Sequence, residues 1–229
     1  MLRLLSFLLM IVWASQGPAL AQGSDIRMVF VGDVMLADGP GRLIRSGKDP
    51  FRHAAAALKD ADITIGNLEC VVASSGKPES KPYTFRAPKQ SLRLLKKYFS
   101  AVSLANNHSG DFGKGAFSEM LQLLEQHQIP YFGGGRNLRT AHQAYIREIH
   151  GKRIAVLGYN GFFPRSFEAH EDAPGIAWLD EDGGVRDTAH QTEPKRGFSD
   201  RVPALGLGVS ETRLKSTAPN GPPDDRRRR

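Results

Sequence analysis

The chain has 229 residues, 40% of them hydrophobic, which is the length and composition of one globular domain of ordinary size. Cys70 is the only cysteine, which excludes an internal disulfide and leaves a hydrophobic core to hold the fold together. The formal net charge of +7 resides mostly in residues 186–229, where ten Lys or Arg face six Asp or Glu, so it does not indicate that the body of the protein binds nucleic acid.

A short apolar segment opens the chain. Arg3 precedes the run from Leu4 to Ala14, and Ala19-Leu20-Ala21 provides small residues at the positions that a signal peptidase recognises. The run is shorter than the roughly 20 apolar residues that span a bilayer. We therefore expect residues 1–21 to be a cleaved signal peptide and the protein to be periplasmic, cell-surface or secreted; a retained membrane anchor is the alternative.

Strand and helix patterns alternate along residues 25–183, which predicts an α/β domain. The predicted strands cover residues 26–34, 61–69, 101–104 and 131–132, and residues 144–149 and 153–158 form a predicted hairpin. The predicted helices cover residues 51–59, 91–99 and 117–128. Residues 37–41 and 73–82 have the composition of loops. Residues 184–229 show no sustained period of 2 or 3.6, and we expect them to be disordered.

Polar side chains stand at the ends of three predicted strands. Asp33 ends the first, Asn67 and Glu69 end the second, and Asn107 and His108 follow the third. Successive strands of a sheet end at one crevice, so these groups can meet although they lie far apart in sequence. Their oxygen atoms suit Mg²⁺, Mn²⁺ or Ca²⁺, whereas added imidazoles would favour Zn²⁺ or Fe. A cation there would polarise a phosphoryl or carbonyl oxygen, and His108 would protonate a leaving oxygen.

A structural interpretation of the same residues stays open. In it, Asp33 caps a helix, while Asn67 and Asn107 form hydrogen bonds with loop backbone. We expect Asp111 to cap the helix that follows it and not to bind metal.

The sequence resembles the CapA-type proteins, bacterial capsule (poly-gamma-glutamate) biosynthesis proteins related to calcineurin-like metallophosphatases. The resemblance covers roughly residues 25–182 and rests on five ordered segments: Val31-Gly32-Asp33-Val34-Met35-Leu36, Gly66-Asn67-Leu68-Glu69, Ser103-Leu104-Ala105-Asn106-Asn107-His108 with Asp111 and Gly113, Gly133-Gly134-Gly135-Arg136-Asn137, and Gly158-Tyr159-Asn160. It implies a four-layer sandwich of two mixed sheets with helices outside. It also implies metal-ligand roles for Asp33, Glu69 and Asn107, a catalytic role for His108, and a function in capsule polymer assembly or export at the cell surface.

The sequence departs from the family pattern toward its carboxyl end. The family continues with a His-Trp-Gly-x-Glu-Tyr strand end and a later Gly-His-Pro-His type loop, which supply imidazole ligands, and neither is present here. One possible set of codons for residues 204–209, read one nucleotide further on, spells His-Trp-Gly-Trp-Glu-Tyr. Our hypothesis is that the tail is a frameshifted reading of a longer gene that begins near residues 183–187, which would leave the sandwich incomplete and the site impaired. The nucleotide sequence of this region tests the hypothesis directly.

Three functions follow from these observations. The first is a CapA-like exported protein with a metallophosphatase-type site that holds Mn, Mg, Zn or Fe. The second is a working metal-dependent phosphoesterase or related hydrolase. The third is a non-catalytic surface component that binds an anionic polymer through the basic tail. The expected partners are an anionic capsule polymer or phosphoester and a capsule-synthesis membrane complex, without nucleic acid. Whether the protein is an enzyme stays open, since the site lacks its C-terminal His ligands.

Overall fold

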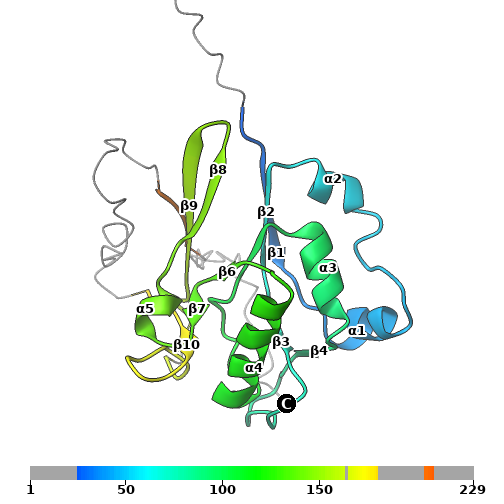
Figure 1. Ribbon diagram of the computed structural model, residues 1–229. Coiled ribbons are helices and arrows are strands. Elements are labelled where there is room, and N and C mark those ends of the chain that lie inside the picture. Colours follow the sequence, from blue (N-terminus) through cyan, green and yellow to red (C-terminus); the bar gives the residue numbers. More distant parts are fainter. Residues whose placement is uncertain (1–24, 163–164, 180–203, 209–229) are drawn as a thin grey trace, which may run out of the picture.

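The computed structural model describes residues 25–162 and 165–179, together with the backbone of residues 204–208. The expected signal peptide, the expected domain boundary near residue 183 and most of the expected tail lie outside these residues. Within them, helices flank a parallel sheet, so the predicted α/β class is confirmed (Figure 1).

The parallel sheet forms the centre of the fold. It contains β1 (Met28–Asp33), β2 (Ile63–Asn67), β5 (Ala101–Ser103) and β6 (Tyr131–Phe132), in that order (Figure 1). The register pairs Asp33 with Asn67 and Asn67 with Ser103, so the carboxyl ends of three strands lie side by side. This alignment positions the candidate site, because the residues that follow parallel strands emerge at the same edge.

Helices cover one face of this sheet: α1 (Asp38–Arg45), α2 (Ala55–Lys59), α3 (Ser91–Tyr98) and α4 (Gly113–Gln126). Helix α5 (Leu138–Ala141) instead packs against Gly134–Gly135 and Gly175–Ile176. Helix α4 buries Phe117, Met120, Leu121 and Leu124 completely, at the spacings of three and four that place side chains on one side of a helix. These side chains belong to the same hydrophobic core as residues of α1 and α3.

A second sheet packs on the other face. Strands β8 (Tyr145–Ile149) and β9 (Lys152–Tyr159) form the predicted antiparallel hairpin, which turns at His150 and Gly151, both with positive φ. Val156 of β9 shares a smaller core with Phe132 and with residues of β2. A Cβ atom on Gly158 would lie 2.9 Å from Ser103 Oγ and 3.0 Å from the Phe132 ring, so glycine permits the close approach of the two sheets.

Two pairs of short strands complete the described fold. Strand β3 (Val71–Val72) pairs parallel with β4 (Arg86–Ala87), and β7 (Gly134–Gly135) pairs antiparallel with β10 (Gly175–Ile176). The described layers are therefore helices, a parallel sheet and a second sheet. They correspond to three of the four layers of the expected sandwich.

Two predictions of irregular structure are wrong. Residues 38–45 form α1 although residues 37–41 have the composition of a loop. Pro40 is tolerated in the first turn, where a backbone N–H has no helical partner, and burial of Ile44 to 1% exposure favours the helix. Expected disorder is also wrong for Ala204–Gly208, which forms β11 and pairs parallel with β9. This stretch contains no charge and no proline, so every residue can take part in the hydrogen-bond ladder of β9.

Across the described residues, we find no helix that combines the length and the apolar character needed to cross a bilayer.

Candidate metal centre

Three of the predicted site residues meet at the carboxyl edge of the parallel sheet. The Asn67 Nδ2 atom donates hydrogen bonds to Asp33 Oδ1 at 2.9 Å and to Glu69 Oε2 at 2.5 Å. Strand β1 delivers Asp33 and strand β2 delivers Asn67, while Glu69 follows two residues later and remains only 9% exposed. The structure therefore brings two carboxylates from different strands onto one amide group. Their role as metal ligands stays a prediction.

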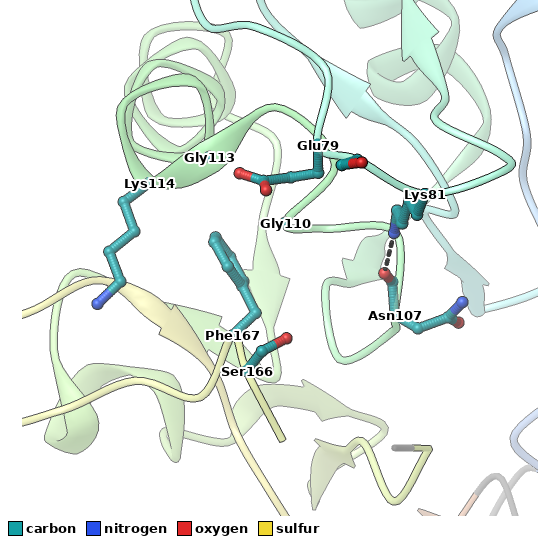
Figure 2. A pocket seen from close by; sticks show the side chains of 9 residues that line it. Glu79, Lys81, Asn107, Gly110, Gly113, Lys114, Ser166 and Phe167 are labelled. Carbon is teal, nitrogen blue, oxygen red and sulfur yellow. Dashed lines mark hydrogen bonds between the residues drawn. The ribbon is translucent and has the colours of Figure 1, made fainter. Parts of the chain in front are cut away.

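The third strand end contributes Asn106, which was not among the predicted site residues, to the hydrogen-bonded cluster, and the metal-ligand role of Asn107 stays a prediction. Asn106 is buried, and its Nδ2 donates to Asn67 Oδ1 at 2.9 Å and to the Leu68 carbonyl at 3.0 Å. The Asn107 side chain is exposed, and in the described part of the chain its amide makes no hydrogen bond. Figure 2 shows this side chain directed away from Phe167, with only the Asn107 carbonyl bonded to Lys81. Sequence reasoning missed Asn106, because nothing in the sequence distinguishes it from its neighbour Asn107.

His108 lies beside Glu69, and contacts with Asp111 and Phe85 hold its ring. Its Nδ1 atom is 2.9 Å from Asp111 Oδ2, its Nε2 atom is 3.9 Å from Glu69 Oε1, and its ring packs against Phe85 at a centroid distance of 4.4 Å. Because a carboxylate only accepts hydrogen bonds, Asp111 places the proton on Nδ1 and leaves Nε2 facing the cluster.

Asp111 does not cap the following helix, so that prediction is wrong. The residue is completely buried, where its carboxylate also accepts a hydrogen bond from the Phe85 backbone at 2.6 Å and pairs with Lys81 Nζ. Helix α4 has no side-chain cap. A buried carboxylate needs charged and hydrogen-bonding partners, and the Lys81, Phe85 and His108 contacts satisfy Asp111 more fully than a cap would.

The environment of the cluster disfavours the charged form of Glu69. Burial, and then the nearby charge of Asp33, raise the pKa of Glu69 to about 7, and the hydrogen bond from Asn67 offsets only part of this increase. A carboxyl group with such a pKa is poorly accommodated as an anion when no cation is present. A cation between Asp33 and Glu69 would relieve the repulsion.

Comparison with known proteins relates this geometry to a family. The family model described as bacterial capsule synthesis protein PGA_cap matches residues 27–216. The chain belongs to this family. The PGA_cap match includes all of the strand ends that form the cluster, and it extends beyond the segment that forms β11.

Several relatives carry names from capsule synthesis. The chain is 26% identical over 202 residues to the capsule biosynthesis protein CapA of Bacillus anthracis, which covers 83% of this chain and 49% of the relative. It is 26% identical over 179 residues to the PGA biosynthesis protein CapA of Bacillus subtilis, covering 72% of this chain and 46% of the relative. A probable polyglutamine synthesis accessory protein of Mycobacterium tuberculosis is 28% identical over 148 residues, covering 61% of this chain and 39% of the relative. The chain thus spans half or less of the length of these curated relatives.

The donor atoms of this PGA_cap chain fit a hard cation better than a soft one. Asp33 and Glu69 offer carboxylate oxygens, and the amide of Asn67 beside them can add a further oxygen ligand. As placed, the Asn67 NH₂ group faces the carboxylates, so its oxygen becomes a ligand only if the amide turns over. Within the described residues, no three or more His, Cys, Asp or Glu side chains are grouped in a way that could hold a metal ion. A site of this composition favours Mg²⁺ or Mn²⁺ over Zn²⁺.

Proposed function

We propose that this PGA_cap protein is exported and takes part in the assembly or export of an anionic capsule polymer such as poly-gamma-glutamate. The family match over residues 27–216 is the observation that carries this proposal. The names of the relatives from two Bacillus species support it. The apolar run from Leu4 to Ala14, followed by Ala19-Leu20-Ala21, supports export to the periplasm, the cell surface or the medium.

The proposal includes a divalent-cation site at the edge of the parallel sheet. Asp33 and Glu69 provide the charged ligands, and the amide oxygen of Asn67 or Asn107 completes the set. Three observations support this assignment: Asn67 donates hydrogen bonds to both carboxylates, Glu69 is buried, and the pKa of Glu69 is raised. When bound, the cation would act as a Lewis acid toward a phosphoryl or carbonyl oxygen.

His108 and Asp111 supply the acid–base part of the proposed site. Asp111 is buried and fixed by Lys81 and by the Phe85 backbone, so it holds the His108 ring in one orientation. The Nε2 atom then faces the same space as Glu69 and can transfer a proton to a leaving oxygen. This arrangement favours phosphoester hydrolysis as the second candidate activity. Among the residues that the structure describes, His108 is the only imidazole at the site. Because Zn²⁺ and Fe prefer imidazole ligands, we propose that the site binds them poorly.

Metal binding tests the proposed site. We expect Mn²⁺ to bind the full chain in isothermal titration calorimetry, and Asp33→Asn or Glu69→Gln to weaken binding at least about tenfold, because each removes one of only two charged ligands. Asp60→Asn is the matched control, since Asp60 is an exposed carboxylate outside the cluster. Equal affinities for all four proteins would refute the site. Turnover of p-nitrophenyl phosphate that depends on His108 would then distinguish a hydrolase from a binding protein.

A further inference from the structure

A pocket of about 440 Å³ opens beside the candidate metal centre (Figure 2). Asn107 and Lys81 line it on the side of the centre, and Phe167 and Lys114 line it further away. The Phe167 ring packs tightly on Gly110, where an added Cβ atom would come within 2.6 Å of the ring. The pocket therefore has an apolar surface in its middle and charged groups around it.

Glu79, Ser80 and Lys81 line one wall of the pocket, and the loop of residues 73–82 that carries them is held in place. The Glu119 carboxylate of α4 accepts hydrogen bonds from the backbone N–H groups of Ser74 and Ser75 at 2.9–3.1 Å. Burial raises the pKa of Glu119, but hydrogen bonds from Lys89 and Ser75 outweigh this effect and lower it to about 2. A wall tied to a helix in this way forms the pocket before any ligand arrives, which lowers the entropic cost of binding.

Contacts of Arg86, Glu79 and Lys81 hold the same loop. The Arg86 guanidinium donates to the carbonyl of Gly76 at 2.8 Å and stacks on the Phe112 ring. The backbone N–H of Glu79 donates to the Asp111 carbonyl at 2.8 Å. Lys81 itself is engaged by the Asn107 carbonyl and by Asp111.

The two lysines at the pocket differ in whether they form an ion pair. Lys81 is committed to Asp111, whereas the Lys114 ammonium group is exposed and, among the described residues, has no ion-pair partner. The hydroxyl group of Ser166 and the carboxylate of Glu79 also lie at the pocket (Figure 2), and Ser80 is a further lining residue. The surroundings thus combine an available cation, an acceptor for N–H groups, and an aromatic ring.

We propose that this pocket binds a segment of an acidic, amide-linked chain. Lys114 pairs with a side carboxylate, Glu79 or a serine hydroxyl accepts an amide N–H, and methylene groups lie on Phe167. The proposal rests on the proposed function, which supplies an acidic polymer as a ligand, but it needs no metal. The shared Lys81 and Asn107 would place the bound segment next to the candidate metal centre.

Binding of fluorescein-labelled γ-linked decaglutamate, followed by fluorescence anisotropy with the full chain in chelator, tests the proposal. We expect saturable binding that Lys114→Glu weakens about fivefold to tenfold, because the change replaces attraction by repulsion at a partly screened site. Ser166→Trp fills the pocket without changing charge and should weaken binding to a similar extent. Ser166 is exposed, so this variant should fold. An α-linked decaglutamate arm shows whether the linkage matters.

Lys152→Glu is the matched charge control, since Lys152 is an exposed lysine at the start of β9 in the hairpin. It should leave binding unchanged. Equal weakening by Lys114→Glu and Lys152→Glu would overturn the proposal, because it would indicate unspecific attraction to a basic protein. Absence of saturable binding to the wild-type chain, or equal binding of uncharged decaglutamine, would overturn it as well. Because chelator is present throughout, these results do not depend on the proposed metal site.

Discussion

The two faces of the parallel sheet are covered differently. On the helix face, α1, α3 and α4 contribute to a large continuous core that includes Phe117 and also the residues next to the candidate site, such as Leu68 and Leu104. On the opposite face, the β8–β9 hairpin closes a smaller core around Phe132 and Val156, with several partners that are only partly buried. The strand ends that bear the site are therefore held mainly by packing on the helix side. The second sheet adds a thinner cover, on which Ile146 remains 40% exposed.

The largest expected effect comes from the helix face. Phe117 is completely buried in α4 and contacts the Phe167 ring at a centroid distance of 5.3 Å. We expect Phe117→Ala to reduce the free energy of unfolding by about 4–5 kcal/mol, since the tightly packed neighbours cannot collapse into the cavity. Chemical denaturation measures this change. A loss below about 2 kcal/mol would contradict the view that the helix face dominates stability.

The corresponding Phe→Ala substitution on the opposite face should cost less stability. Phe132 is 1% exposed and stacks with Tyr145 at a centroid distance of 6.4 Å. We expect Phe132→Ala to reduce the free energy of unfolding by about 3 kcal/mol, because the partly buried hairpin residues can move toward the cavity. If denaturation shows a larger loss for Phe132→Ala than for Phe117→Ala, the proposed order of the two faces is wrong.

The smallest expected effect lies at the site between these faces and depends on pH. The pKa of Glu69 is raised from 4.5 to about 7, so the folded protein binds more protons than the unfolded chain between these values. Stability should therefore fall as pH rises from about 4.5 to 7, by about 2 kcal/mol. Glu69→Gln should remove this slope. Thermal unfolding of both proteins at pH 5 and pH 8 measures it.

A cation should reverse this dependence, which links the pH measurement to the proposed site. If Mn²⁺ binds the ionised carboxylates, it should raise the unfolding temperature more at pH 8 than at pH 5. Equal effects at the two pH values, or an effect that survives Glu69→Gln, would argue against binding at this cluster.

Much of the fold follows from local patterns. The alternation of apolar runs with helical spacing predicted β1, β2, β5, α3, α4 and the hairpin close to their observed bounds. Helix α2 is shorter than predicted, since Asp49 accepts a hydrogen bond from the Phe51 backbone at 2.9 Å and starts a turn in its place.

The site was predictable to the level of its strand ends but not of its individual contacts. Asp33, Asn67 and Glu69 meet as expected from the rule for parallel strands. The choice between Asn106 and Asn107 was not predictable, because adjacent residues of a turn point in different directions and only their partners decide which is buried. The role of Asp111 was missed for the same reason, since its partners Lys81 and Phe85 lie 30 and 26 positions away in sequence.

The sequence alone determined which residue types stand at the ends of which strands, and with them the α/β class and the family resemblance. It could do so because hydrophobic period and strand-end chemistry are local properties of the chain. The packed structure was needed to show that Asn106 supports Asn67, that Asp111 orients His108, and that an anchored loop forms a pocket beside them. These contacts join residues that are distant in sequence, and burial and hydrogen-bond satisfaction select among them only once the sheet and helices have packed.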